Sequence, residues 1–296
     1  MRRAPLARAD QLHCRPSKPD VTGRALKHIT SRDNPSFKEL AKLVNSSRER
    51  RKRGLTVLDG VHLIQAYSER FGVPQALFVA EGKAQSEEIR ALLETLRPLA
   101  PTLVSDNLFK EVSAVEASTG VIAVVATPMV AKAPAQLDFC LLLEDIQDPG
   151  NLGSILRSAA AAGIEHAFLS AGCAFAWSPR VLRAAMGAHF ILSIHEGANL
   201  RALAEAFHGK VIASVPRGDA SLFEADLTGP VALLVGNEGS GLSRDLLAIA
   251  TQRVTIPMPG KIESLNAAAA AAICLFERVR QVAQNESLGR QVRSLG

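Results

Sequence analysis

Hydrophobic and polar positions alternate along the chain in two successive blocks of helix-like and strand-like segments. In the first block, apolar residues at helical spacing alternate with short extended runs of apolar residues. The helical segments are 36–44, 62–71 and 86–96, and the extended ones are 55–58, 75–79, 103–104 and 121–126. The first block therefore predicts a small α/β domain over residues 25–127.

The second block repeats the alternation with longer elements. It predicts strands over 139–143, 166–169, 211–214, 231–235 and 254–256, and helices over 153–162, 179–185, 200–207, 243–250 and 265–282. Near-continuous apolar strands between helices are typical of a mainly parallel sheet that helices cover on both faces. We therefore expect a second α/β domain over residues 138–283, with ligands bound at loops beyond the carboxyl ends of its strands.

Three segments outside these blocks lack helical or strand periodicity. Residues 1–24 mix Arg, Pro, Asp and Lys, which predicts a disordered basic extension; a transit peptide is the alternative, but acidic residues interrupt it. Residues 128–137 contain two prolines and several alanines and predict a linker between the domains. Residues 284–296 are expected to form a flexible tail.

Composition excludes several classes of protein. Charged residues and prolines interrupt every long apolar run, so we expect no membrane span. The four cysteines and seven histidines lie far apart, which argues against a disulfide framework or a metal site and is compatible with a cytoplasmic protein. The remaining classes are globular enzymes and binding proteins.

Positive charge is concentrated near the N-terminus. The whole chain has a formal net charge of +5, whereas residues 1–60 alone carry fifteen Lys or Arg and six Asp or Glu. This imbalance suggests a polyanionic partner. The densest run, residues 48–53, could contact phosphates, or it could form the solvated end of a helix.

The first of three polar loops, residues 144–154, follows the predicted strand 139–143. A Pro149-Gly150 turn and a helix N-cap at Asn151 would explain most of its composition. Neither feature requires Arg157 in the following helix. Its guanidinium could point back over the loop towards a phosphate or a reacting hydroxyl, or it could be an ordinary surface arginine.

The second loop, residues 236–243, has three glycines within six residues. This density indicates tight backbone turns or the close approach of a ligand to the main chain. The glycine spacing does not match the dinucleotide-binding fingerprint, and no Gly-Lys-Ser or Gly-Lys-Thr of a phosphate loop is present. Glu238 is better suited to orienting hydroxyls or a cationic group than to binding a phosphate.

The third loop, residues 256–266, precedes a run of six alanines. Ser264 could serve as the N-cap of the following helix, with Asn266 in its first turn. The alanines would allow the helix to pack very close to a neighbouring backbone, although helix propensity alone is the competing explanation.

In their order and spacing, the three loops resemble the three motifs of the SpoU (TrmH) family of the SPOUT methyltransferase superfamily. The matching segments are 148–153 with Arg157, 236–239, and 256–258 with 264–266. The resemblance implies S-adenosyl-L-methionine-dependent methyl transfer to a ribose 2′-hydroxyl of structured RNA. It also implies a deep trefoil knot in the C-terminal sheet, a rare exception to unknotted topology.

The resemblance also implies roles for individual residues. Main-chain groups of Gly236, Ile256 and Leu265 would bind the cofactor in a bent form. The catalytic cluster would comprise Asn151, Arg157, Glu238, Ser264 and Asn266, with Arg157 nearest to the target ribose. Because arginine normally stays protonated, Arg157 would act either as a base assisted by an RNA phosphate or as an electrostatic stabiliser of the developing alkoxide.

The first block is similar, more loosely, to a substrate-binding domain related to small ribosomal RNA-binding proteins, in which Asp59 replaces the usual glutamate. The family also forms homodimers through its knotted domain. Residues 177–188, with Arg180 and Arg183, resemble a segment close to that interface. For Trp177, the only tryptophan, we expect packing rather than base stacking.

Three alternatives remain beside methylation of ribosomal RNA. Transfer RNA is a second possible substrate. A non-catalytic RNA-binding or ribosome-assembly protein could keep the fold, although the intact motif residues argue against it. A nicotinamide-dependent dehydrogenase would need a glycine fingerprint after its first strand, which is absent.

Overall fold

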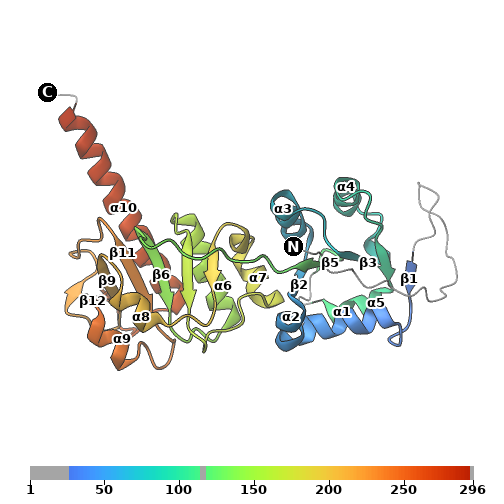
Figure 1. The fold of residues 1–296 in the computed structure, drawn as a ribbon, viewed down its shortest axis with the longest axis horizontal. Helices are drawn as coiled ribbons and strands as arrows, with labels where there is room; N and C mark the ends of the chain where they lie inside the picture. Colours follow the sequence, from blue (N-terminus) through green and yellow to red (C-terminus); the bar gives the residue numbers. More distant parts are fainter. Residues whose placement is uncertain (1–26, 114–117, 294–296) are drawn as a thin grey trace, which may run out of the picture.

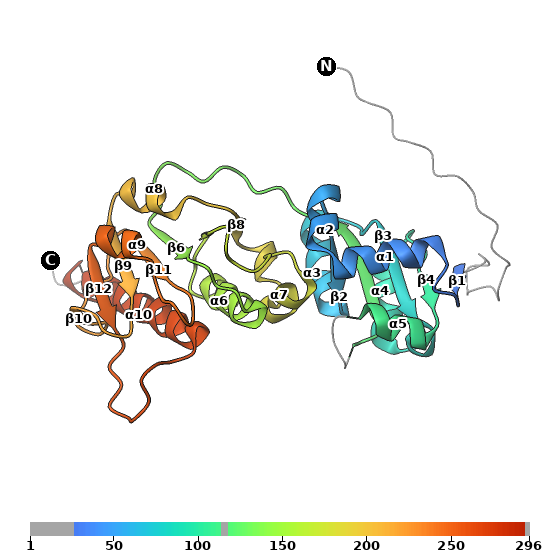
Figure 2. The same cartoon turned by 90° about the horizontal axis from the view of Figure 1, so that it is seen from below.

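The computed structural model describes residues 27–113 and 118–293, with side chains through residue 287. Two α/β domains, each built on its own sheet, lie end to end (Figure 1). The extension expected at residues 1–24 lies outside the described residues. Residues 128–137, expected to form a linker, contain no helix or strand and run between the two domains (Figure 2).

The front domain has a five-stranded sheet in the order β1-β4-β3-β5-β2. Strands β1, β4 and β3 pair in parallel, whereas β5 is antiparallel to both of its neighbours. The strands are β1 (Lys27–Ile29), β2 (Leu55–Asp59), β3 (Ala76–Ala80), β4 (Thr102–Val104) and β5 (Val121–Ala126). The helices are α1 (Pro35–Asn45), α2 (Ser47–Arg53), α3 (Val61–Phe71), α4 (Glu87–Thr95) and α5 (Asp106–Val112), with a 3-10 turn η1 (Glu81–Lys83).

Helices cover both faces of the front sheet. Helices α1 and α5 bury Phe37, Leu40 and Phe109 against one face, and α3 and α4 bury Ile64 and Leu92 against the other. The small α/β domain and its longer elements are therefore as the sequence predicts. The short elements β1, α2 and α5 were not predicted, because three to seven residues are too few to establish a periodicity.

The C-terminal domain has a seven-stranded sheet in the order β10-β12-β9-β11-β6-β7-β8, and every neighbouring pair is parallel. The predicted mainly parallel sheet is confirmed. Its strands are β6 (Phe139–Leu143), β7 (His166–Leu169), β8 (Ser193–His195), β9 (Lys210–Ser214), β10 (Ala220–Ser221), β11 (Val231–Val235) and β12 (Gln252–Thr255). The helices are α6 (Pro149–Ala161), α7 (Pro179–Ala185), α8 (Leu200–Glu205), α9 (Arg244–Ile249) and α10 (Ala267–Arg293), with a 3-10 turn η2 (Ala188–Phe190).

The alternation of side chains along the strands separates two apolar layers. Leu141 and Leu143 of β6 join the core formed with α6, α7 and α10, whereas Leu142 faces the layer formed with α8 and α9. Helices α6 and α7 pack unusually close together. A Cβ atom on Gly153 would lie 2.5 Å from the Cβ atom of Ala184, so this crossing requires glycine.

Helix α10 corrects one expectation about the C-terminus. The sequence predicted a helix ending near residue 282 and a flexible tail over 284–296. The helix instead begins at Ala267 and continues to Arg293, and Figure 1 shows its last turns extending beyond the sheet. Residues 294–296 lie outside the described part of the chain.

The two domains meet at a packed contact between the front sheet and the segment around α7. Thr56 Oγ1 of β2 donates a buried hydrogen bond of 2.7 Å to the carbonyl oxygen of Trp177. Arg51 lies over the ring of Phe175, with 4.2 Å between its guanidinium carbon and the ring centroid, and pairs with Glu196 at 3.5 Å. Trp177 is 4% exposed, so its expected packing role is confirmed.

The basic run over residues 48–53 forms helix α2, and three of its arginines have structural partners. Arg50 is buried and donates to the carbonyl oxygens of Leu43 and Val44, which lie near the C-terminal end of α1. Arg51 lies in the domain contact described above, and Arg53 pairs with glutamates of α1 and α2. Of the two interpretations of this run, the structure favours the helix end, and two of its five basic residues, Arg51 and Arg53, pair with glutamates.

Among the described residues, no helix is long and apolar enough to cross a membrane. The cysteines in this part of the chain, Cys140, Cys173 and Cys274, are all free. No group of three or more His, Cys, Asp or Glu residues within the described ranges could hold a metal ion.

Candidate active site

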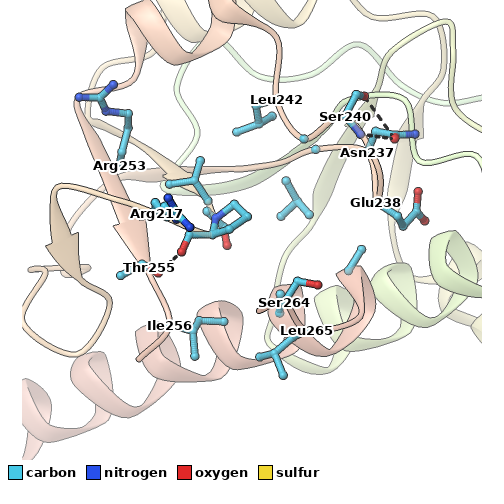
Figure 3. Close-up of a pocket in the computed structure, with 18 of the residues that line it drawn as sticks. Arg217, Asn237, Glu238, Ser240, Leu242, Arg253, Thr255, Ile256, Ser264 and Leu265 are labelled. Atoms are coloured by element: carbon cyan, nitrogen blue, oxygen red, sulfur yellow. Dashed lines mark hydrogen bonds between the residues drawn. The ribbon is translucent and has the colours of Figure 1, made fainter. Parts of the chain in front are cut away.

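The three polar loops meet at the carboxyl ends of β6, β11 and β12. A cavity of about 470 Å³ opens between the second and third loops (Figure 3). Its walls come from 214–217 after β9, 235–242 after β11, 253–258 at the end of β12, and 264–270 at the start of α10. Residues far apart in the sequence therefore form one site at the sheet edge where ligands of parallel α/β folds bind.

A chain of hydrogen bonds connects the three motif loops through their side chains. Asn266 Nδ2 donates to Asn151 Oδ1 at 2.8 Å, and Asn151 Nδ2 donates to Glu238 Oε1 at 2.8 Å. Each asparagine uses its amide in one orientation, because a flipped Asn151 would place its Nδ2 against another donor and its Oδ1 against a carboxylate. The network fixes the relative positions of all three loops.

The helix caps differ from those expected from the sequence. Asp148, not Asn151, caps α6: its side chain accepts from the main-chain nitrogen of Asn151 at 2.7 Å, and Pro149 occupies the first helical position. Asn266, not Ser264, caps α10, because its Oδ1 accepts from the main-chain nitrogens of Ala268 and Ala269. Because the Asn151 side chain caps neither helix, it is free to bond across the loops.

The second loop requires glycine at its start. A Cβ atom on Gly236 would lie 2.5 Å from the carbonyl carbon of Gly241 and 2.6 Å from the main-chain nitrogen of Leu242. The two ends of the loop are held together by reciprocal main-chain hydrogen bonds between Asn237 and Gly241. The loop therefore presents its peptide groups to the cavity with no room for a side chain at its base.

Asn237 is a structural residue of the site that the sequence analysis did not single out. Its Oδ1 accepts from the main-chain nitrogens of Gly239 and Ser240, at 2.8 and 3.0 Å (Figure 3). Its Nδ2 donates to the carbonyl oxygen of Asp145 at 2.8 Å. An asparagine within a glycine-rich loop is a common side-chain turn former, so the signal was present in the sequence.

Asp145, whose carbonyl oxygen accepts the hydrogen bond from Asn237, is itself held in place. Its backbone has a φ of 53°, in the left-handed region that few residues other than glycine adopt. Its main-chain nitrogen donates to Ser170 Oγ, and Ser170 Oγ donates back to Asp145 Oδ1 at 2.6 Å. This reciprocal pair holds the first loop in a conformation that presents the Asp145 carbonyl to Asn237.

The structure brings most of the predicted site residues together. Gly236, Ile256 and Leu265, expected to bind the cofactor, all line the cavity, as do Glu238 and Ser264 of the expected catalytic cluster. Asn151 and Asn266 lie at its edge, bonded to Glu238 directly or through each other.

Arg157 lies apart from this group. Its side chain is exposed on α6, does not line the cavity, and has no hydrogen bond or ion pair among the described residues. Its guanidinium is therefore available to an external anion.

The cavity fits an adenosine-containing cofactor. Its volume lies within the usual range for small-molecule sites of roughly 300–1,000 Å³. Leu242, Leu247, Ile256 and Leu265 supply apolar walls on which a purine ring could pack, and the peptide groups of the second and third loops supply donors and acceptors. Such a lining suits recognition through the main chain.

Comparison with known proteins shows the family. The profile of the SpoU rRNA Methylase family matches residues 138–276, and that of the MRM3-like substrate binding domain matches residues 34–123. The 23S rRNA (uridine(2479)-2′-O)-methyltransferase of Streptomyces viridochromogenes is 32% identical over 269 residues, which cover 87% of this chain and 93% of that protein. The chain belongs to the SpoU rRNA methylase family.

Other SpoU relatives extend the match over both domains. The 23S rRNA (guanosine(2553)-2′-O)-methyltransferase RlmP of Bacillus subtilis is 31% identical, over 85% of this chain and 98% of its own. The solved structure of the SpoU methyltransferase AviRb from Streptomyces viridochromogenes, in complex with the cofactor AdoMet, has a TM-score of 0.74 and 29% identity. It covers 84% of this chain and 98% of that one. The SpoU family uses S-adenosyl-L-methionine, in agreement with the cofactor expected from the sequence.

Proposed function

We propose that this SpoU protein transfers a methyl group from S-adenosyl-L-methionine to a ribose 2′-hydroxyl of ribosomal RNA. The observation that carries the proposal is the Asn266–Asn151–Glu238 network at the edge of a cavity lined by Gly236 and Leu265. The ribosomal RNA methyltransferases named above resemble the chain over both domains, which supports the choice of reaction and of RNA class.

The cofactor is proposed to lie between the second and third loops, against Gly236, Ile256 and Leu265. When bound, it supplies a sulfonium methyl group, which is already a good electrophile. The protein's main task is therefore to hold the two reactants in line and to manage the proton of the hydroxyl. The network fixes Glu238 and the ends of α6 and α10. Ser264 lies beside this network, and its hydroxyl makes no hydrogen bond to any described residue.

Arg157 is proposed to act on the RNA side of the reaction. Its guanidinium is exposed and has no partner within the described ranges, so it can bind a phosphate of the incoming RNA and stabilise the alkoxide that develops on the ribose. Arginine side chains stay protonated in proteins, so electrostatic stabilisation requires no change in charge. General-base action would require the bound phosphate to assist the loss of the proton.

The fold is proposed to contain the trefoil knot of the SPOUT superfamily. Helix α10 begins beside the first loop, where Asn266 bonds Asn151, and continues into the core with Ala271 and Leu275. The long segment between β12 and α10 (Figure 2) supplies the chain for such a crossing. A homodimer through this domain is supported by Met186 and Ile191, which leave 55% and 62% of their surfaces exposed near the segment that resembles the family interface.

Ribosomal RNA is favoured over transfer RNA because the front domain matches a substrate-binding domain and two relatives that match both domains are 23S rRNA enzymes. The proposed relation of the front domain to ribosomal proteins agrees with the choice of ribosomal RNA. A non-catalytic role is disfavoured because each motif side chain is present and three of them are hydrogen-bonded in one network.

The proposal is tested by incubating the full chain with labelled S-adenosyl-L-methionine and RNA from a strain that lacks this protein. Ribosomal and transfer RNA are separated before counting. We expect label in ribosomal RNA alone. Label only in transfer RNA would show the same reaction on the other class of RNA. If the protein binds the cofactor but labels neither free RNA nor ribosomal subunits, the result would support a non-catalytic binding protein.

A further inference from the structure

The cavity has two charged sides, and only one has an assigned role. Glu238 lies on the side of the Asn151 network, and Arg217 lies on the opposite side, with Ser264 and Leu265 between them (Figure 3). Arg217 belongs to the segment after β9, which is outside the three motif loops. It has no hydrogen bond or ion pair among the described residues.

Arg253, the other arginine that lines the cavity, differs from Arg217 because it has an acidic partner. Arg253 Nε and its terminal nitrogen donate to the two carboxylate oxygens of Asp219 at 2.7 and 2.9 Å. This bidentate pair raises the pKa of Arg253, chiefly through the hydrogen bond to Asp219, and compensates its charge. Of the described residues that line the cavity, Arg217 is therefore the one cation without a counterion.

The backbone that carries Arg217 is held in place on both sides. Val215 donates its main-chain N–H to the carbonyl oxygen of Val254, and Asp219 donates to that of Arg253. Thr255 Oγ1 donates to the carbonyl oxygen of Pro216 at 2.9 Å (Figure 3).

The next residue adds a steric constraint. A Cβ atom on Gly218 would lie 2.6 Å from the carbonyl oxygen of Arg253, so the turn lies directly on β12. The main chain at Arg217 is thus fixed, while its exposed guanidinium has no partner among the described residues. A fixed main chain lowers the cost of binding a ligand at this position, because the backbone order is already established before the ligand binds.

We infer that Arg217 binds the carboxylate at the amino-acid end of S-adenosyl-L-methionine, an inference that rests on the proposed function. A carboxylate within a partly enclosed site needs a cation or several N–H donors, and a guanidinium matches its geometry with two parallel bonds. The opposite charges of the two sides then orient the cofactor: the carboxylate lies towards Arg217, and the cationic sulfonium lies towards Glu238 and the RNA.

An RNA phosphate is the other anion that could reach this cavity. The position of Arg217 disfavours it, because the motif network, beside which the reacting ribose is proposed to bind, lies on the opposite side of the cavity, at Glu238. Binding measurements without RNA separate the two anions.

The test compares two ligands that differ only in the carboxylate, S-adenosyl-L-methionine and its decarboxylated form, by calorimetry on the full chain. We expect Arg217→Ala to weaken binding of the first on the order of tenfold, the usual scale for one charge-assisted hydrogen-bonded contact with partial solvent access. Binding of the decarboxylated ligand should stay within about twofold of the wild type. Arg217→Lys should lie between the two.

Arg244→Ala is the matched control, since Arg244 is exposed at the start of α9 and does not line the cavity. It should leave both affinities unchanged. Equal weakening of both ligands by Arg217→Ala would assign Arg217 to the adenosine part and overturn the inference. Unchanged cofactor binding with weakened binding of a ribosomal RNA fragment would assign it to RNA. Either result leaves the proposed function intact, whereas failure of the wild type to bind either ligand would overturn both.

Discussion

The side-chain amide of Asn151 donates a hydrogen bond of 2.8 Å to Glu238 Oε1 and so joins the loop after β6 to the loop after β11. The same amide accepts from Asn266, which caps α10. One asparagine therefore connects three segments, with partners that lie 87 and 115 residues away in the sequence. The side chains of Glu238, Asn151 and Asn266 therefore form one hydrogen-bonded unit.

Asn151→Ala should lower the rate of methyl transfer by roughly 10- to 100-fold, because both bonds are lost and Glu238 is no longer held in place. Asn266→Asp should have a similar effect while keeping the oxygen that caps α10. Because both changes break one network, the double variant should be little slower than either single variant. If the rate losses of the two single variants multiply in the double variant, the two asparagines act independently. Asn107→Ala, on the exposed face of α5, is the control.

Gly236→Ala should weaken cofactor binding by at least about tenfold and lower the free energy of unfolding by roughly 1–3 kcal/mol, since the added methyl group overlaps the main chain at Gly241 and the loop must move. Gly260→Ala is the matched control in the third loop, because a Cβ atom there meets nothing within 4 Å. Calorimetry and urea denaturation measure both effects. Equal behaviour of the two variants would show that the second loop does not contact the cofactor.

His189 should make the protein sensitive to acid. Burial lowers the pKa of His189 to about 4. Its Nε2 bonds the carbonyl oxygen of Ala176, while its Nδ1 has no partner in the part of the chain that the structure describes. Below the ordinary pKa of about 6.5, the unfolded chain binds a proton that the folded chain does not bind until about pH 4. The free energy of unfolding should therefore fall as pH falls through this window, by roughly 3 kcal/mol at its lower end.

Urea denaturation at about pH 7 and about pH 5 checks this expectation. His189→Gln keeps an N–H donor but cannot titrate, so its stability should depend less on pH than that of the wild type. His62→Gln, at a side chain that is 81% exposed, should follow the wild type. A steep acid dependence that persists in His189→Gln would locate the sensitive group elsewhere.

Thr56→Val should loosen the contact between the domains. Valine has nearly the shape of threonine but leaves the buried carbonyl oxygen of Trp177 without its donor, which typically costs about 1–3 kcal/mol. The measurement is the free energy of the first unfolding transition in urea. Thr102→Val is the control, because the Thr102 hydroxyl makes no hydrogen bond within the described residues. Equal stability of both variants would mean that water replaces the lost bond.

The long elements could be predicted from the sequence because their burial is uniform. All five residues of β11 are buried, and the apolar run of 231–235 reflects this directly. The edge strands β8 and β10 have three and two residues, some of them polar, and are defined by pairing with β7 and β12 rather than by their own pattern. Helix α10 was predicted too short because its last turns extend beyond the sheet.

The sequence predicted which residues belong to the site better than which hydrogen bonds connect them. The loops that meet were identified, but the cap of α6 was assigned to Asn151 although Asp148 precedes Pro149, the residue favoured at the first helical position. The bond from Asn237 to Asp145 joins loops ninety-two residues apart, and only the folded chain brings them together. The structural roles of Arg50 and Arg53 also depend on tertiary partners that a charge pattern does not reveal.

The most direct test of the account is the position of the methyl group on the RNA. Ribosomal RNA from a strain lacking this protein is methylated with wild type or with Arg157→Ala and digested to nucleosides, and the products are identified by mass spectrometry, with cofactor affinity measured in parallel. We predict a single 2′-O-methylnucleoside with the wild type, and none with Arg157→Ala at unchanged cofactor affinity. A methyl group on a base, or a fully active Arg157→Ala variant, would contradict the account.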